Sequence, residues 1–223
     1  MVFWMGSALV LLLAYIVGST PTGYLAGKLF RRIDIREHGS GSTGATNVLR
    51  IVGKWPALAV LLFDVLKGAG AIIFARWFCF WLLGLPSIAP PSSLDLQTVV
   101  NWAVCAAGIA VLLGHSRSIW LNFKGGKSAA TGLGVLIAMS WPVGLGAVTV
   151  FIVVLVTSRI VSLSSMLAAL AAIALVFGLE QPLPYRLLVA VGGTYVVLRH
   201  RANIHRLLAG TEPRLGQTPA QAR

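Results

Sequence analysis

Charged residues are scarce in this chain of 223 residues. Only 11% of the residues are Asp, Glu, Lys or Arg, whereas 57% are apolar. Soluble domains usually carry about a quarter charged residues. So few charges cannot cover a surface that faces water, which excludes an ordinary soluble domain. The lipid bilayer is the solvent that this composition fits.

Acidic residues are the rarest charged type, with 6 Asp and Glu against 18 Lys and Arg and a net charge of +12. An excess of this sign can indicate nucleic-acid binding. Here, however, the basic residues lie in short gaps between long apolar runs, which is typical of membrane topology. No nucleic-acid partner is therefore expected.

Several chemical motifs are missing. The two cysteines, Cys79 and Cys105, form no CxxC pair, which excludes the common zinc and redox motifs. The loops hold no paired carboxylates of the kind that bind two metals. Neither a His followed five residues later by Asp, as in HxxxxD acyltransferases, nor a GxSxG nucleophile elbow occurs. Neither a cofactor nor a metal is expected.

Long apolar segments are abundant. A transmembrane helix needs roughly 20 apolar residues, and fewer where it packs inside a bundle. No Lys or Arg precedes Lys28, so the first segment lacks the basic start of a signal peptide and is expected to remain as a helix. We predict an all-α polytopic membrane protein with seven transmembrane helices at Phe3–Leu25, Pro56–Phe74, Val99–Leu113, Ala129–Met139, Val143–Val156, Leu163–Phe177 and Tyr185–Leu198.

Two details of this helix pattern lead to further expectations. Trp141 and Pro142 should form a tight turn between the fourth and fifth helices. The fourth helix is short and carries Gly132 and Gly134, so it should pack against other helices and not against lipid. One domain, 1–223, is expected, with a linker-like outer insertion at Gly84–Gln97 and a partly disordered tail after Gly210.

The basic residues predict the orientation. If the N-terminus lies outside, the outer segments hold only Arg76 and Arg186. The positive-inside rule then favours an outer N-terminus and a cytosolic C-terminus. The cytosolic segments hold Arg31, Arg32, Arg36, Arg50, Lys54, Arg117, Lys124, Lys127, Arg159, Arg199, Arg201, Arg206, Arg214 and Arg223.

Three polar segments fall on the cytosolic side in this topology: Arg36–Arg50, Gly114–Thr131 and Arg199–Glu212. The first reads GSGSTGATN from Gly39 to Asn47. Its glycines let backbone amides turn inward, its hydroxyls add donors, and a helix starting near Ala45 would point its positive end at the loop. This indicates an anion site, to which Arg50 adds charge; the alternative is a flexible polar turn.

The second segment reads FKGGKS from Phe123 to Ser128 and leads into the fourth helix, which favours another anion site at a helix start. Its alternative is a pair of lysines anchored at lipid headgroups. His115 before it is equally a structural cap or a catalyst. In the third segment, His200 and Asn203 share one helical face, where His200 could donate to an oxyanion or phosphate and Asn203 could hold a hydroxyl. The alternative is a basic helix end that touches anionic lipid.

Asp64 and Lys67 lie three residues apart inside the second predicted span. A charge pair in the membrane is costly and needs partners. We interpret it as a structural ion pair that fixes the bundle; the functional alternative is that Lys67 tunes the site.

These motifs together resemble the bacterial acyl-phosphate:glycerol-3-phosphate acyltransferases, from about residue 18 to residue 214. The departures are Ser42, where the family usually has Asn, Ser128, where it has Gly, and the Ser116–Ile119 stretch, which lacks Phe-Pro. The resemblance rests on Gly18–Leu25, Asp34–Arg36, Gly39–Arg50, Phe63–Gly68, Phe123–Lys127, Ala130–Gly132, His200–Gly210 and Glu212.

The resemblance implies transfer of an acyl chain from acyl phosphate to the sn-1 hydroxyl of glycerol 3-phosphate, which gives lysophosphatidic acid. The enzyme would lie in the bacterial inner (plasma) membrane among membrane lipids, with its active site on the cytosolic face, and would depend on an acyl-phosphate-producing enzyme. Glu212 would be mainly structural. The expected catalytic residues are Ser40, Arg50, Lys127, His200 and Asn203, and the expected substrate-binding residues are Gly39, Gly41, Thr46, Asn47, Gly125, Gly126 and Ser128.

Acyl phosphate carries a good leaving group, so the substrate hydroxyl can attack directly and the protein must gather two phosphates and stabilise the oxyanion. Lys127 and the second loop should hold the acyl phosphate, while Ser40, Arg50, His200 and Asn203 hold glycerol 3-phosphate. The proton acceptor is either His200 or the phosphate of the substrate. A transporter of a phosphorylated solute and a non-enzymatic membrane subunit are the alternative functions.

Overall fold

A computed structural model describes residues 2–86 and 95–217, and the regular structure within them is helical. Residues 87–94 of the predicted insertion and residues 218–223 of the predicted tail lie outside the described residues. The elements are α1 (Val2–Ser19), α2 (Thr22–Arg31), η1 (Ile35–Glu37), α3 (Ala45–Ile51), α4 (Lys54–Leu83), α5 (Leu96–Ser116), η2 (Ile119–Leu121), α6 (Ala129–Met139), α7 (Trp141–Ser158), α8 (Val161–Gly178), α9 (Leu183–Arg199) and α10 (Arg201–Leu208).

The helices include several that suit a membrane. α6 and α9, with 11 and 17 residues, are shorter than the 18-residue helices α1, α7 and α8. Among the described residues the chain thus has five candidate spans in an all-helical fold, and the count of seven stays a prediction. The five stretches long and apolar enough to cross a bilayer are Val2–Arg31, Lys54–Leu83, Leu96–Leu121, Trp141–Ser158 and Val161–Gly178.

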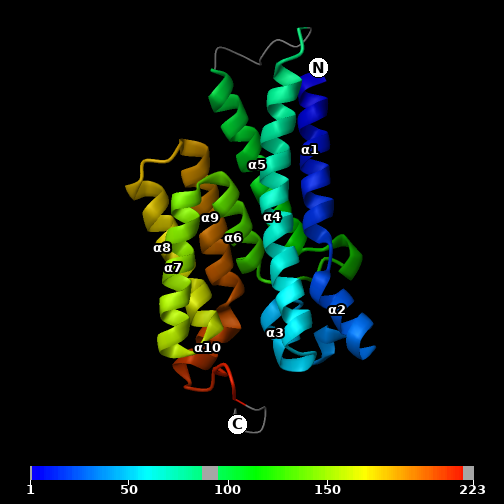
Figure 1. The fold of residues 1–223 in the computed structure, drawn as a ribbon, viewed down its shortest axis with the longest axis vertical. Coiled ribbons are helices and arrows are strands. Elements are labelled where there is room, and N and C mark those ends of the chain that lie inside the picture. Colours follow the sequence, from blue (N-terminus) through cyan, green and yellow to red (C-terminus); the bar gives the residue numbers. More distant parts are fainter. Residues whose placement is uncertain (1, 87–94, 218–223) are drawn as a thin grey trace.

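The helices form two groups that α6 joins. In the first group, α1, α4 and α5 pack on one another, and in the second α7 packs on α8 and α8 on α9 (Figure 1). α6 packs on both α4 and α7. α2, α3 and α10 lie together at the end of the molecule opposite to the start of α1 (Figure 1). The first and third predicted polar segments, which include α3 and α10, therefore lie toward this end.

The first predicted span, Phe3–Leu25, is wrong as a single helix, because α1 ends at Ser19 and α2 begins at Thr22. Pro21 causes the break, since its ring excludes a helical hydrogen bond and restricts the residue before it. At the break, the carbonyl of Thr20 accepts from the Thr22 amide at 3.1 Å and from Lys67 Nζ at 3.0 Å. Lys67 and Asp64 form an ion pair of 2.7 Å, and Thr22 Oγ1 donates to Asp64 at 2.8 Å. The intramembrane charge pair thus fastens the break between α1 and α2 to α4.

Arg76 does not lie in an outer segment, as the topology argument assumed, because α4 continues beyond the predicted Phe74 to Leu83. The added residues are largely apolar and aromatic, and Phe74, Phe78 and Trp81 pack ring against ring along the helix. The guanidinium of Arg76 donates to the carbonyl of Met139 at 3.4 Å and to the hydroxyl of Tyr185 at 3.2 Å. This arginine therefore has partners on α6 and α9.

The turn predicted at Trp141–Pro142 is also misplaced, because both residues belong to the first turn of α7. Proline fits there, where a helix needs no amide donor and where a fixed φ favours the start. Ser140 alone, with extended φ and ψ of −149° and 96°, joins α6 to α7.

The predicted packing of the fourth helix is confirmed, and its bounds, Ala129–Met139, agree with the structure. A methyl group at Gly134 would overlap the carbonyl of Val65, and one at Gly68 would overlap the carbonyl of Thr131. Glycines on both helices therefore let the backbones of α4 and α6 touch, as small residues do in membrane bundles.

Candidate active site

Asn47 organises the first polar loop. α3 starts at Ala45, as predicted, and places the fully buried Asn47 side chain inside the turn. Its Nδ2 donates to the carbonyls of Ile35, His38 and Ser42 at 3.2, 3.0 and 2.9 Å, and its Oδ1 accepts from the Ser40 amide at 3.0 Å. The side chain is thus occupied by the loop itself, and its contribution to a ligand is to hold the loop in shape.

Gly39 lies in the same loop at a φ of +60°, and a methyl group there would overlap Asn47 Oδ1. Both the left-handed backbone and the close approach require glycine. Gly39 therefore supports the shape of the loop through its contact with Asn47 and does not line the cavity described below.

The second loop rests on His115. The amide of Gly126 donates to the carbonyl of His115 at 3.1 Å, and a methyl group at Gly126 would overlap the imidazole. From α9, Arg199 donates to the carbonyls of Gly125 and Gly126 at 3.3 and 3.0 Å. The loop is therefore held by α5 on one side and α9 on the other, and His115 is a support of the loop.

Ser128 ends this loop in the left-handed region, with a φ of 63°, immediately before α6. Its hydroxyl donates to the carbonyl of Leu112 at 3.0 Å. A serine at this φ is strained by about 1 kcal/mol or more relative to glycine, and the buried hydrogen bond offsets part of that cost. The structure thus explains both why glycine suits the position and how serine is accommodated.

His200 lies where α9 ends and α10 begins. Its Nδ1 is 2.8 Å from the carbonyl of Val196. A carbonyl can only accept, so Nδ1 carries the proton in the neutral ring and Nε2 is left as an acceptor. The contact therefore favours a role in which His200 accepts from a hydroxyl over the role of donor to a phosphate or oxyanion.

Asn203 links the third segment to the second loop. Lys127 Nζ donates to Asn203 Oδ1 at 2.6 Å, and Asn203 Nδ2 donates to Glu212 Oε1 at 2.6 Å. Glu212 also accepts from Ser162 at 2.7 Å and from Arg206 Nε at 2.7 Å. A chain of hydrogen bonds thus runs from the lysine of the second loop, through α10, to the carboxylate of the C-terminal segment.

The C-terminal segment crosses the same end of the molecule. The carbonyl of Pro213 accepts from Arg50 Nη2 at 3.4 Å, and the amide of Leu215 donates to the carbonyl of Arg159 at 2.7 Å. Residues after α10 are therefore attached both to α3 and to the turn between α7 and α8.

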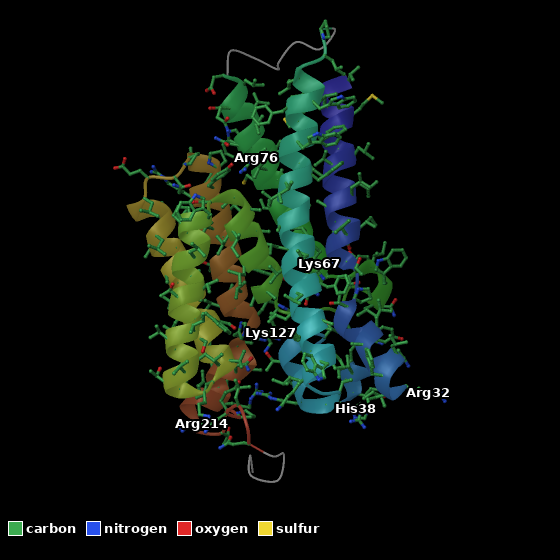
Figure 2. The ribbon with its side chains drawn as sticks, in the orientation of Figure 1. Arg32, His38, Lys67, Arg76, Lys127 and Arg214 are labelled. Carbon is green, nitrogen blue, oxygen red and sulfur yellow. The ribbon has the colours of Figure 1, made fainter. Side chains whose placement is uncertain are left out.

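The predicted catalytic residues line one cavity of about 290 Å³. Figure 2 shows Lys127 between the two helix groups, with His38 and Arg214 nearer the end of the molecule. Thr46, Asn47 and Ser128 also reach the cavity wall, whereas Gly39 and Gly126 do not. Gly41 and Gly125 face a separate polar hollow. The residues predicted as catalytic and brought together here are Ser40, Arg50, Lys127, His200 and Asn203.

The cavity has a polar end at these residues and an apolar remainder between α6, α7, α8 and α9. Within the described parts of the chain, no group of three His, Cys, Asp or Glu side chains could hold a metal ion. A cavity of this kind can hold an amphiphile, with an anionic group among the cations and a hydrocarbon chain between the helices. The apolar wall is formed by Leu112, Leu133, Val135, Leu136, Ala147, Val148, Phe151, Ala168, Ala169, Ala172, Leu188, Val189 and Val196.

Comparisons with known proteins identify the family. The family model described as "Glycerol-3-phosphate acyltransferase" matches residues 8–210. "Glycerol-3-phosphate acyltransferase 2" of Rhizobium johnstonii is 73% identical over 217 residues, which cover 97% of this chain and 99% of that protein. The chain belongs to the glycerol-3-phosphate acyltransferase family. The glycerol-3-phosphate acyltransferase of Acaryochloris marina is 54% identical over 216 residues, or 96% of this chain and 94% of that one.

Two crystal structures of PlsY (YgiH), an integral membrane glycerol 3-phosphate acyltransferase, share this fold. The glycerol 3-phosphate form has a TM-score of 0.82 at 33% identity, over 94% of this chain and 96% of that chain. The lysophosphatidic acid form has a TM-score of 0.78 at 32% identity, over 97% of each chain. The resemblance inferred from the motifs is therefore confirmed.

The site of this family member has a perturbed electrostatic balance. Burial lowers the pKa of Lys127 to about 8, with Glu212 opposing the shift and Arg206, Arg50 and Arg199 adding to it. Burial likewise lowers the pKa of His200 to about 4, so the ring is neutral at pH 7. Burial also lowers the pKa of the Arg50 guanidinium. The site thus concentrates positive charge that an anionic ligand would relieve.

Glu212 is the carboxylate within this cluster. Burial opposes its ionisation, but hydrogen bonds from Ser162, Asn203 and Arg206 outweigh burial and lower its pKa. Sequence reasoning missed Ser162 and Arg199 as parts of the site, because a serine near a helix start and an arginine near a helix end have many ordinary roles. The signal that could have found them is their position, since both lie where a predicted span meets the polar side.

Proposed function

We propose that this chain transfers an acyl group from acyl phosphate to the sn-1 hydroxyl of glycerol 3-phosphate, giving lysophosphatidic acid and inorganic phosphate. The observation that carries the proposal is the single cavity in which three polar segments, far apart in the sequence, meet at the mouth of an apolar pocket. Two anions and one hydrocarbon chain are the ligands that this combination suits.

Lys127 holds the acyl phosphate at the start of α6, where its side chain lines the cavity. Arg50 and Ser40 hold the phosphate of glycerol 3-phosphate from the opposite wall, and Asn203 orients Lys127 through their 2.6 Å bond. Bringing two phosphates together costs electrostatic repulsion, which the cations in this cluster offset. The acyl chain extends into the apolar part of the cavity.

The reaction is a direct acyl transfer. The glycerol hydroxyl oxygen forms a bond to the acyl carbonyl carbon, the bond from that carbon to the phosphate oxygen breaks, and phosphate leaves with the electron pair. His200 accepts a hydrogen bond from the hydroxyl at Nε2 and orients it. The proton passes to a phosphate oxygen, because a phosphate monoester with a second pKa of about 6 is a stronger base than this histidine, whose pKa is about 4.

The chain is a single domain that crosses the bacterial inner membrane seven times, with α1 and α2 counted as one span and the shorter α6 and α9 as two more. The N-terminus lies outside and the C-terminus in the cytosol. The positive-inside rule supports this orientation, because Arg32 and Arg214 lie toward the end of the molecule that holds α2, α3 and α10 (Figure 2). The active site then faces the cytosol, where a separate enzyme supplies acyl phosphate.

The activity is tested with purified protein, labelled glycerol 3-phosphate and, in turn, acyl phosphate and acyl-CoA. Product from acyl phosphate alone is expected. Lys127→Met should abolish most of the activity, whereas the matched Lys124→Met, which lies outside the cavity, should keep it. Uptake of labelled solute into vesicles without any acylated product would instead establish the transporter alternative.

A further inference from the structure

The apolar part of the cavity has a similar depth along three of its helices. The last wall residues are Ala147 on α7, Ala172 on α8 and Leu188 on α9. The corresponding helix ends near the polar site are Ser158, Val161 and Arg199. At about 1.5 Å per residue, each of these three intervals covers about 16 Å along its helix axis.

A floor of buried side chains closes this cavity. One helical turn beyond the last wall residues, α6, α7, α8 and α9 each contribute one residue that does not line the cavity and is almost inaccessible to solvent. These four residues, which we call the floor, are Met139 of α6, Val143 of α7, Val176 of α8 and Tyr185 of α9, with exposed fractions of 6%, 0%, 0% and 5%. The cavity therefore ends inside the bundle.

Arg76 fastens two of the floor residues from α4. Its guanidinium donates to the backbone carbonyl of Met139 at 3.4 Å and to the hydroxyl of Tyr185 at 3.2 Å. Arginine inside an apolar helix is costly and needs a reason to be there. The proposed reaction does not use this residue. Arg76 lies on α4, well away from Lys127 (Figure 2). Its contacts give it a role as a brace for the floor.

We propose that the floor sets the acyl-chain-length preference of the enzyme, with Arg76 as the residue that positions it. This inference rests on the proposed function, because it assumes that the occupant is an acyl chain. A carbon–carbon bond of about 1.5 Å at an angle near 111° advances about 1.25 Å per methylene, so a depth of about 16 Å takes roughly 13 carbons in extended form. The end of the chain then meets the floor, and extra methylenes must displace it.

A side exit is the competing path for the end of the chain. Leu61 of α4 lines the cavity and is 40% exposed, and Phe151 of α7 lines it too. A route between Leu61 on α4 and Phe151 on α7 would lead the end of the chain out of the bundle. An acyl chain that left by this route would not touch the floor. Substitutions at Val176 or Ala172 would then leave the chain-length preference unchanged.

Two substitutions change the closed end of the cavity in opposite directions, one at the floor and one on the wall next to it. Val176→Ala deepens the cavity, and Ala172→Val fills its end. With each purified variant we would measure kcat/KM for saturated acyl phosphates of about 8 to 18 carbons, a range that brackets the length expected to fill the cavity. Val176→Ala should shift the optimum to longer chains, and the relative kcat/KM should rise about fourfold for each methylene newly accommodated. Ala172→Val should shift the optimum to shorter chains.

Matched controls carry the same changes on lipid-facing positions. Ala174→Val on α8 and Val191→Ala on α9 are exposed and lie off the cavity wall, so their profiles should match that of the parent. Arg76→Met should flatten the profile at long chain lengths, because it frees Tyr185 and Met139. Partial misfolding lowers the rates for all chains alike and leaves the shape of a profile unchanged.

Profiles of Val176→Ala and Ala172→Val that superimpose on those of the controls would overturn the floor proposal and point to the side exit. Failure of the proposed function has a different signature. In that case, the parent protein gives no product with an acyl phosphate of any length.

Discussion

The charge on Glu212 should determine the pH at which the enzyme loses affinity for its donor. Lys127 must be protonated to attract a phosphate, and its pKa of about 8 lies close to physiological pH. As pH rises through this value the ammonium loses its proton, so kcat/KM for acyl phosphate, which reports the free enzyme, should fall with a midpoint near 8. Among the charged groups that act on Lys127, Glu212 is the one that raises this pKa.

The size of the effect follows from the contacts. Lys127 Nζ and Glu212 Oε1 are joined through the Asn203 amide by two hydrogen bonds of 2.6 Å. The two charges are therefore separated by roughly 7 Å. At an effective dielectric constant of about 20, opposite unit charges at that distance attract by about 2 kcal/mol, which corresponds to more than one pKa unit.

Glu212→Gln keeps the shape of the side chain and removes its charge. The alkaline limb of the kcat/KM profile should then move to lower pH by about one unit. Ser162→Ala is the control, because it removes a hydrogen bond to Glu212 and leaves the charge in place. An alkaline limb that stays where it is in Glu212→Gln, or moves to higher pH, would refute the electrostatic reasoning.

Four further substitutions, two of them combined, test the supporting structure. Gly134→Ala should lower the thermal stability of the detergent-solubilised protein by about 1–3 kcal/mol, since the new methyl group meets the Val65 carbonyl; an unchanged melting temperature would contradict this packing. Asp64→Asn should destabilise by about 3–5 kcal/mol, and pairing it with Lys67→Met should restore much of the loss in the same melting assay. Asn47→Asp should raise KM for glycerol 3-phosphate about tenfold or more, because the three carbonyls that Asn47 binds lose their donor, and steady-state kinetics with an unchanged KM would exclude its role in shaping the loop.

Much of the architecture follows from apolar runs and from charge. The bounds of α6 and the start of α3 agree with the prediction, because a glycine-rich polar stretch marks each helix start. The meeting of the three polar segments also agrees, since basic loops that share one side of a membrane have little room to separate. Such features depend on local composition, which a single sequence displays.

Other features depend on partners that lie far away in the sequence. The sequence predicts an outer position for Arg76 because the predicted second span ends at Phe74, yet α4 continues and Tyr185 and Met139 supply the arginine with acceptors. The sequence leaves His200 open as a donor or a proton acceptor, because its tautomer depends on the carbonyl of Val196. Pro21 signalled a helix break on its own, and the long apolar run around it hid that signal.

The attachment of Glu212 also has a consequence for how the protein is made. The chain is synthesised from its N-terminus, so every membrane helix leaves the ribosome before the residue that orders Asn203, Ser162 and Arg206 around one carboxylate. During synthesis, the pocket therefore stays incomplete until Glu212 has been added. A chain truncated just before Glu212 could insert all its helices into the bilayer and still fail to order the cations of the site.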